Sequence, residues 1–213
     1  MSESRYDEFV DSLKELPLSV WKATPCESIS WKLLKPFSNS WEFGHFASLF
    51  VALGLNDYAT IGKAEVGYWP KIVPEMSPYI DPANPLELID ILRPLFTNER
   101  LGQKKVKRLE MFARSALCSR VWGSTAPAIA SEFTDIRIQL GKTMNQKPTD
   151  ETIALAIKCL AFALLMVDEV SFDYGAIPVP VDSRIRCLSA RLGLPNADED
   201  TERLRWAGAS SNS

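Results

Sequence analysis

A single carboxylate, Asp182, follows the stretch IPVPV at residues 177–181 and precedes SRIRCLSARLGL, a predicted short helix that closes at Gly193. Prolines lack an N–H donor and force extended geometry on their neighbours, so the approach to Asp182 is stiff. As an N-cap, an aspartate stabilises a helix by about 1 kcal/mol, and that structural role would explain the pattern alone. A capping carboxylate is also held rigidly, which suits electrostatic stabilisation of a positive charge that develops during a reaction.

Two further candidate residues lie on one predicted helix. Glu151 and Lys158 are seven residues apart, so they share a helix face and stand about 10 Å apart along the axis, with Leu155 between them. A glutamate can polarise water or protonate a leaving group. A lysine among apolar residues needs a partner or a cleft. Pairing with Asp168 or Asp173 is the structural alternative for Lys158, and both roles stay open.

The elements that must position these residues are predicted to be helical. Hydrophobic periodicity predicts helices over 4–16, 41–55, 85–93, 99–120, 125–141, 150–170 and 183–193. The 150–170 segment is apolar on every side apart from Lys158, which predicts the central buried helix. Residues 17–40 are predicted to be loop-rich, and the proline-rich stretch 66–85 to be largely irregular. No segment alternates as a strand does, so the predicted fold class is all-α.

Composition and charge bound the class of protein. The chain has 213 residues, of which 46% are hydrophobic, and this suits one helical unit over 1–213 or two small, closely packed ones. Net charge is −3, yet seven Lys and Arg lie between Arg100 and Arg120 against one acid, Glu110. Such a locally basic face fits nucleic acid, although a solvated helix face would look the same.

Several kinds of chemistry are poorly supported by the sequence. The four cysteines form no CxxC pair, and His45 is the single histidine, so zinc, iron–sulfur and Ser–His–Asp sites are not expected. Neither GxGxxG nor a P-loop occurs, so no nucleotide cofactor is expected. The polar N-terminus predicts no signal peptide and a cytoplasmic protein, and no segment predicts a membrane span.

Three blocks of the sequence resemble one known family. They are ETIALAIKCLAFAL at 151–164, IPVPVDSRIRCLSARLGL at 177–194 and GQKKVKRLEMFARS at 102–115, and Trp69 in VGYW is a weaker match. The chain is similar there to the archaeal 8-oxoguanine DNA glycosylases, a divergent branch of the helix–hairpin–helix DNA glycosylase superfamily. The likeness runs intermittently from about residue 45 to about residue 205 and is most specific in the proline-rich block.

The resemblance implies two helical subdomains with double-stranded DNA across the cleft between them, and base flipping of a modified nucleotide into a pocket. Asp182 would then stabilise the positive sugar as the glycosidic bond breaks. Lys158 would contact the flipped base, with Trp69 and Leu155 beside it. The implied DNA contacts are Lys104, Lys105, Lys107, Arg108, Arg184 and Arg186. The resemblance implies no metal and no cofactor, and a monomer is expected.

One position departs from the family pattern. Glu151 stands where the family has its Schiff-base lysine, and a glutamate forms no imine. The resemblance therefore implies a monofunctional glycosylase without strand cleavage, unless Lys147, which Pro148 separates from the helix, acts as a displaced nucleophile.

The base pocket of the family also looks altered in this chain. Cys26 aligns loosely with the recognition glutamine, and the C-terminal pocket helix has no clear counterpart. An opened pocket favours a bulky base, and glucosylated 5-hydroxymethylcytosine of phage DNA is the leading expectation, as in bacterial antiviral proteins of this type. The alternatives are 8-oxoguanine repair, a catalytically inactive DNA-binding module, and a helical interaction protein without a DNA role.

Overall fold

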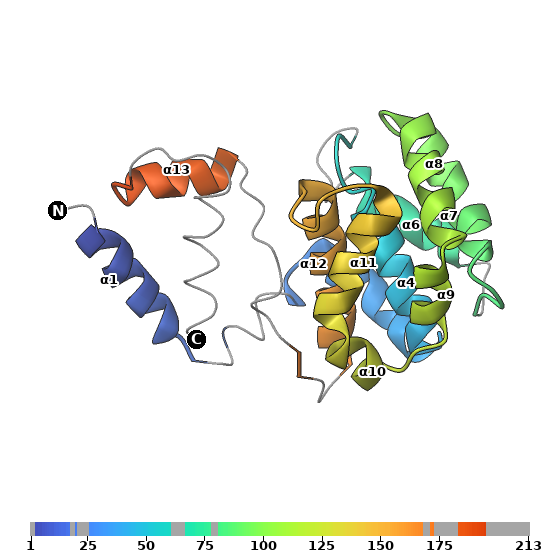
Figure 1. Ribbon diagram of the computed structural model, residues 1–213, viewed down its shortest axis with the longest axis horizontal. Helices are drawn as coiled ribbons and strands as arrows, with labels where there is room; N and C mark the ends of the chain where they lie inside the picture. Colours follow the sequence, from blue (N-terminus) through green and yellow to red (C-terminus); the bar gives the residue numbers. More distant parts are fainter. Residues whose placement is uncertain are drawn as a thin grey trace.

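The computed structural model describes residues 3–17, 20, 26–60, 67–77, 81–167, 171–172 and 183–194. Within these ranges the regular structure is entirely helical, and no strand occurs (Figure 1). The predicted all-α class is therefore confirmed. Asp182, Asp168 and Asp173 lie outside the described residues, so the predictions made for them stay predictions.

The helices follow the hydrophobic pattern with a few differences. Their bounds are α1 Glu3–Lys14, α3 Ile29–Leu34, the 3₁₀ helix η1 Lys35–Asn39, α4 Phe43–Gly54, α6 Trp69–Met76, α7 Glu87–Thr97, α8 Gly102–Ala113, α9 Ala116–Trp122, α10 Ala126–Ser131, α11 Phe133–Met144, α12 Glu151–Met166 and α13 Ser183–Arg191. The predicted helices at 4–16, 41–55, 150–170 and 183–193 are present with shifts at their ends.

The predicted basic helix over 99–120 is wrong as a single element. It is divided between α8 and α9, because the Ser115 side chain accepts a hydrogen bond from the Cys118 N–H and so caps a new helix. The predicted helix at 125–141 is likewise two helices that meet at Glu132, whose φ and ψ of −100° and 10° interrupt the helical geometry. Because of these two breaks, short helices rather than long ones surround the pair of core helices α4 and α12.

The prediction that 66–85 is largely irregular is also wrong, because α6 lies within it. Pro70 stands in the first turn, where its missing N–H costs no hydrogen bond. Pro74 lies inside the helix, yet Ile72 and Met76 are fully buried on its inner face. Burial of this apolar face outweighs the hydrogen bond that Pro74 removes, since a large buried side chain contributes about 1.5–3 kcal/mol.

The core is organised around α4 and α12, which pack against each other along most of their length. Every residue of α4 from Phe46 to Gly54 is buried. Gly54 allows the closest approach, because a Cβ at this position would lie 2.6 Å from the Cα of Ala156. The remaining helices surround this pair, and in Figure 1 the α11–α12 connection and the start of α8 lie at one end of the helical body, with α10 at the other.

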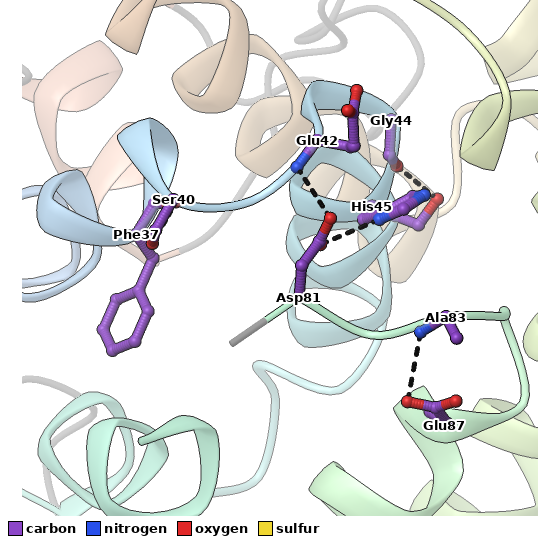
Figure 2. Close-up of polar contacts among 9 residues, drawn as sticks. Phe37, Ser40, Glu42, Gly44, His45, Asp81, Ala83 and Glu87 are labelled. Atoms are coloured by element: carbon purple, nitrogen blue, oxygen red, sulfur yellow. Dashed lines mark hydrogen bonds and ion pairs between the residues drawn. The ribbon is translucent and has the colours of Figure 1, made fainter. Parts of the chain in front are cut away.

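A histidine–aspartate pair fastens the segment before α7 to the start of α4. His45 Nδ1 lies 2.8 Å from Asp81 Oδ1, and the other carboxylate oxygen accepts the Glu42 N–H at 3.4 Å (Figure 2). The imidazole stacks on the Trp122 ring, with 4.1 Å between centroids. The Ser48 hydroxyl donates to the Gly44 carbonyl at 2.8 Å. The group is therefore a structural clamp and contains no serine nucleophile.

Candidate functional site

The connection between α11 and α12 forms a compact hairpin. Asn145 ends α11 in the left-handed conformation, with φ 53°. The Lys147 N–H donates to Asp150 Oδ2 at 3.1 Å, and the Thr152 hydroxyl donates to Gln146 Oε1 at 2.9 Å. These bonds fix the six-residue connection at both of its sides. The result is a helix–hairpin–helix arrangement that delivers Glu151 at the first position of α12.

Glu151 is exposed in the first turn of α12. The N-terminal end of a helix carries a partial positive charge, so an acidic side chain is well placed there. No described residue is paired with this carboxylate. It is therefore available to a ligand that approaches the hairpin end of the molecule.

Lys158 lies on the same side of α12, as its spacing from Glu151 predicts, and it is exposed. Its Nζ stands 5.7 Å from the centroid of the Phe162 ring, one turn further along the helix. Leu155, Phe162 and Leu165 are half-buried along this side. The prediction that α12 is buried all round is therefore wrong for one face, which presents a lysine and an aromatic ring on an apolar strip.

The neighbouring residue, Cys159, faces the opposite way. It is buried against the core, and burial raises the pKa of its thiol to about 12. Two consecutive residues of α12 thus carry an exposed ammonium group, on Lys158, and a buried thiol, on Cys159. The contrast shows how sharply the two faces of α12 differ.

Trp69 lies in the core. Only 6% of its surface is exposed, and its ring meets the Tyr68 ring edge-on with 5.4 Å between centroids. Tyr68 is itself fully buried and donates its hydroxyl to the Leu53 carbonyl at 2.9 Å. This packing supports a structural role for Trp69 and gives no open ring face for stacking on a base in the described conformation.

The predicted DNA-contacting residues of α8 divide into two groups. Lys104 and Lys107 are exposed, but Lys105 is fully buried, and its Nζ lies 3.8 Å from Glu99 Oε2. Lys105 therefore does not belong to the exposed set, since a buried ammonium reaches no phosphate. The sequence did carry a signal for this, because Lys105, Leu109 and Phe112 fall on one helix face.

Arg108 is half-buried and takes part in internal contacts. It donates to the Leu55 carbonyl at 3.0 Å and lies over the Tyr58 ring, 4.7 Å from its centroid. On α13, Arg186 is exposed, whereas the side chain of Arg184 lies outside the described residues. Lys104, Lys107 and Arg186 are thus the exposed members of the predicted set.

Two residues that sequence reasoning missed are Glu99 and Tyr58. Glu99 is a buried acid whose side chain is 1% exposed, and it contacts both Lys71 and Lys105. The Tyr58 ring lies beside Lys105 and Arg108. Glu99 is the first residue of the predicted basic helix over 99–120, and the nearby lysines were the sequence hint of its pairing.

A groove of about 260 Å³ lies beside the histidine clamp, lined by residues 42–45 and 122–126. It contains none of the predicted site residues and lies at the start of α4, away from the hairpin. In the described part of the chain, no cluster of three or more His, Cys, Asp or Glu side chains is placed to hold a metal ion. No helix among the described residues is long and apolar enough to span a membrane.

Comparison with protein families gives a match along nearly the whole chain. The family model described as AGOG, N-glycosylase/DNA lyase, matches residues 10–209. The chain belongs to this family. A curated relative, the N-glycosylase/DNA lyase of Methanopyrus kandleri, is 28% identical over 110 residues, which cover 51% of this chain and 43% of the relative. The chain thus matches less than half the length of that protein.

The family match includes both carboxylates that sequence analysis singled out, Glu151 and Asp182. It also agrees with the all-helical architecture of the described residues. Within this family the chain carries an acid at the start of α12.

Proposed function

We propose that the protein is a monofunctional DNA glycosylase that removes a modified base from double-stranded DNA and leaves the sugar–phosphate chain intact. Membership of the N-glycosylase/DNA lyase family supports the glycosylase part. The observation that carries the proposal is Glu151, an exposed carboxylate at the first position of α12, where the resemblance expects the Schiff-base lysine. A carboxylate cannot form the imine that strand cleavage requires.

The proposed reaction is hydrolysis of the bond between C1′ and the base nitrogen. The bonding electron pair leaves with the base, and the sugar becomes positively charged. Asp182 stabilises that charge electrostatically. Glu151 either polarises the water that adds to C1′ or supplies a proton to the departing base. One water is consumed, and the products are the free base and an abasic site.

Binding of the flipped base is assigned to the exposed side of α12. Lys158 offers three N–H donors beside the Phe162 ring, and Leu155 provides apolar surface one turn earlier. Exposed Lys104 and Lys107 on α8 and Arg186 on α13 are the proposed phosphate contacts.

The finer proposal concerns the substrate, which is glucosylated 5-hydroxymethylcytosine of phage DNA, in an antiviral role. It is supported by the resemblance, in which Cys26 aligns loosely with the family's recognition glutamine and the C-terminal pocket helix has no clear counterpart. 8-Oxoguanine fits the family match equally well. A bulky glucosyl group requires an open pocket, whereas 8-oxoguanine requires donors and acceptors placed against a purine edge.

The experiment that tests the proposal is base release measured by mass spectrometry. Glucosylated phage DNA, an 8-oxoguanine duplex and unmodified DNA are incubated with the wild-type protein and with Asp182→Asn. We expect a base from one modified DNA only, with at least a hundredfold slower release by Asp182→Asn and strands that break only on alkali treatment.

A second variant tests the part played by Glu151. Glu151→Lys should form a sugar adduct that borohydride traps, whereas the wild-type protein should form none. An adduct with wild-type protein would overturn the monofunctional assignment and point to a lysine such as Lys147. Binding of DNA without release of any base would instead support a catalytically inactive binding module.

A further inference from the structure

The exposed side of α12 continues past the residues that are assigned to the flipped base. Leu155 and Lys158 lie in the first half of the helix, and Phe162 and Leu165 are half-buried further along. The helix ends at Met166, so about 12 Å of it lies beyond Lys158. That length is more than one heterocycle covers. The strip therefore has room for a group that the base carries.

A lysine from a distant part of the chain contacts the far end of this strip. Lys35 is the first residue of η1, and its Nζ donates a hydrogen bond to the carbonyl oxygen of Met166. The last carbonyl groups of a helix lack partners within the helix and carry partial negative charge, so an ammonium group is a suitable donor there. The bond joins residues that are 131 positions apart and holds η1 against the end of α12.

Trp31 on α3 lies beside this contact. Lys35 Nζ stands 5.9 Å from the centroid of the Trp31 ring. The backbone of Trp31 is fixed at both of its polar groups, because its N–H donates to the Ser28 hydroxyl at 3.2 Å and its carbonyl accepts the Lys35 N–H. The side chain is half-buried, and among the described residues no acceptor is paired with its indole N–H. A ring held in this way loses little entropy when a ligand binds to it.

Two ammonium groups and two aromatic rings thus follow one another from the middle of α12 to α3. Lys158 Nζ stands over the Phe162 ring, as Lys35 Nζ stands beside the Trp31 ring. Lys158 is exposed, whereas Lys35 is half-buried and has given one of its three N–H donors to a carbonyl. The Trp31 end therefore suits a phosphate poorly. An aromatic ring with a few N–H donors around it fits a neutral ligand that has an apolar face and hydroxyl groups.

We propose that Trp31 and Lys35 form a specificity-determining subsite for a hexose that is carried on the flipped base. The inference rests on the proposed glycosylase function and deepens it. The sugar places a C–H face on the Trp31 ring, and its hydroxyl oxygens accept from the indole N–H and from Lys35 Nζ. A base without the sugar reaches Lys158 and Leu155 only. The subsite therefore sets how much faster a glucosylated base is released than the same base without its sugar.

The test compares Trp31→Leu with Phe37→Leu in the full-length protein. Phe37 is a matched control, because it is also a half-buried aromatic residue packed against the core, but its ring meets the Trp41 ring, with 6.4 Å between centroids. Single-turnover base release is measured on duplexes that contain 5-hydroxymethylcytosine with and without glucose. We expect Trp31→Leu to lower the ratio of the two rates at least tenfold, through slower release of the glucosylated base. Phe37→Leu should leave the ratio unchanged.

Variants of Lys35 and a conservative change at Trp31 separate recognition from folding. Lys35→Met should also lower the ratio, whereas Lys32→Met, which loses an exposed pair with Glu27 at 2.7 Å, should not. Trp31→Phe keeps a ring and should recover part of the ratio that Trp31→Leu loses. A role confined to folding would instead slow both substrates by the same factor. An unchanged ratio in folded Trp31→Leu would therefore overturn the subsite.

A binding measurement keeps the inference separate from the enzymatic proposal. In the Asp182→Asn background, the glucosylated duplex should bind at least fivefold tighter than the unglucosylated one by fluorescence anisotropy, and Trp31→Leu should remove this difference. Equal affinities before the Trp31 substitution, or a difference that survives it, would overturn the subsite. Absence of base release from every DNA would overturn the proposed function, with the affinity comparison still deciding the role of Trp31.

Discussion

α8 is the most polar of the long core-packing helices and α12 is among the most apolar, yet α8 carries a buried lysine whereas the lysine of α12 is exposed. Lys105 on α8 is fully buried against Glu99, whereas Lys158 on apolar α12 is exposed beside Phe162. The overall composition of a helix therefore does not determine whether one of its residues is buried or exposed. The side of the helix on which the residue falls, and what packs there, determine this.

The two helices also differ in how they serve the proposed site. α12 carries its candidate groups directly, at its first turn and along its exposed side. α8 exposes a basic row on one side and uses its buried lysine to anchor the preceding turn. A lysine on each helix is thus expected to matter, but for folding in one case and for ligand binding in the other.

The two lysines are expected to differ most in how much they contribute to folding stability. Lys105→Met should lower the free energy of unfolding by about 3 kcal/mol, the lower end of the range for a broken buried ion pair, because Lys71 still contacts Glu99. Lys158→Met should change it by less than about 0.5 kcal/mol. Urea unfolding at pH 7 measures both.

A double variant is the control for this effect. Lys105→Met combined with Glu99→Leu replaces the pair by apolar groups and should regain most of the lost stability. Equal losses for Lys105→Met and Lys158→Met would contradict the different environments of the two lysines. A double variant no more stable than Lys105→Met would show that the charge pair is not the cause.

A smaller effect concerns the two faces of α12 at alkaline pH. Burial raises the pKa of the Cys159 thiol from 9.0 to about 12, so the folded protein keeps a proton that the unfolded chain loses. The stability contributed by this thiol is complete below pH 9 and is lost as pH rises towards 12, by at most about 1.4 kcal/mol per pH unit. Cys159→Ala should therefore show a shallower fall in unfolding free energy between pH 9 and 10.5.

Cys118 on α9 provides an independent check of the same effect. Burial raises the pKa of its thiol to about 12 as well. Cys118→Ala should thus reduce the alkaline slope by the same amount, and the double variant by twice that amount. If the free energy of unfolding fell equally with pH for the wild type and both single variants, the thiols would not be buried as described.

The smallest expected effect is on the salt dependence of DNA binding. Lys104→Ser combined with Lys107→Ser should reduce the slope of log K against log salt concentration by about 2, since each phosphate contact contributes about 0.9. Lys105→Met, assayed at a temperature where it is folded, should leave the slope unchanged. Fluorescence anisotropy on a duplex between about 50 and 200 mM salt gives both slopes. If the slope fell as much per lysine for Lys105→Met as for the double variant of Lys104 and Lys107, the two faces of α8 would not differ in DNA binding.

The helical class and many of the helix positions could be predicted from the sequence alone. Apolar residues at helical spacing require one buried face, and the pattern located α4 and α12 within a few residues. It failed where short-range chemistry competes with periodicity, as at the Ser115 cap, and where burial outweighs proline, as in α6. The shared side of Glu151 and Lys158 also followed from spacing alone, because helix geometry is local.

Which of these polar residues face solvent depends on the packing of the folded chain and could not be predicted from local patterns. The burial of Lys105, its pairing with Glu99 and the enclosure of Trp69 depend on helices that are distant in the sequence, so no local pattern specifies them. The left-handed Leu101 is likewise imposed by the close approach of α7 and α8 at Gly102. The spacing of side chains along a helix follows from the local sequence. Which of those side chains are buried depends on the other parts of the folded chain that pack against the helix.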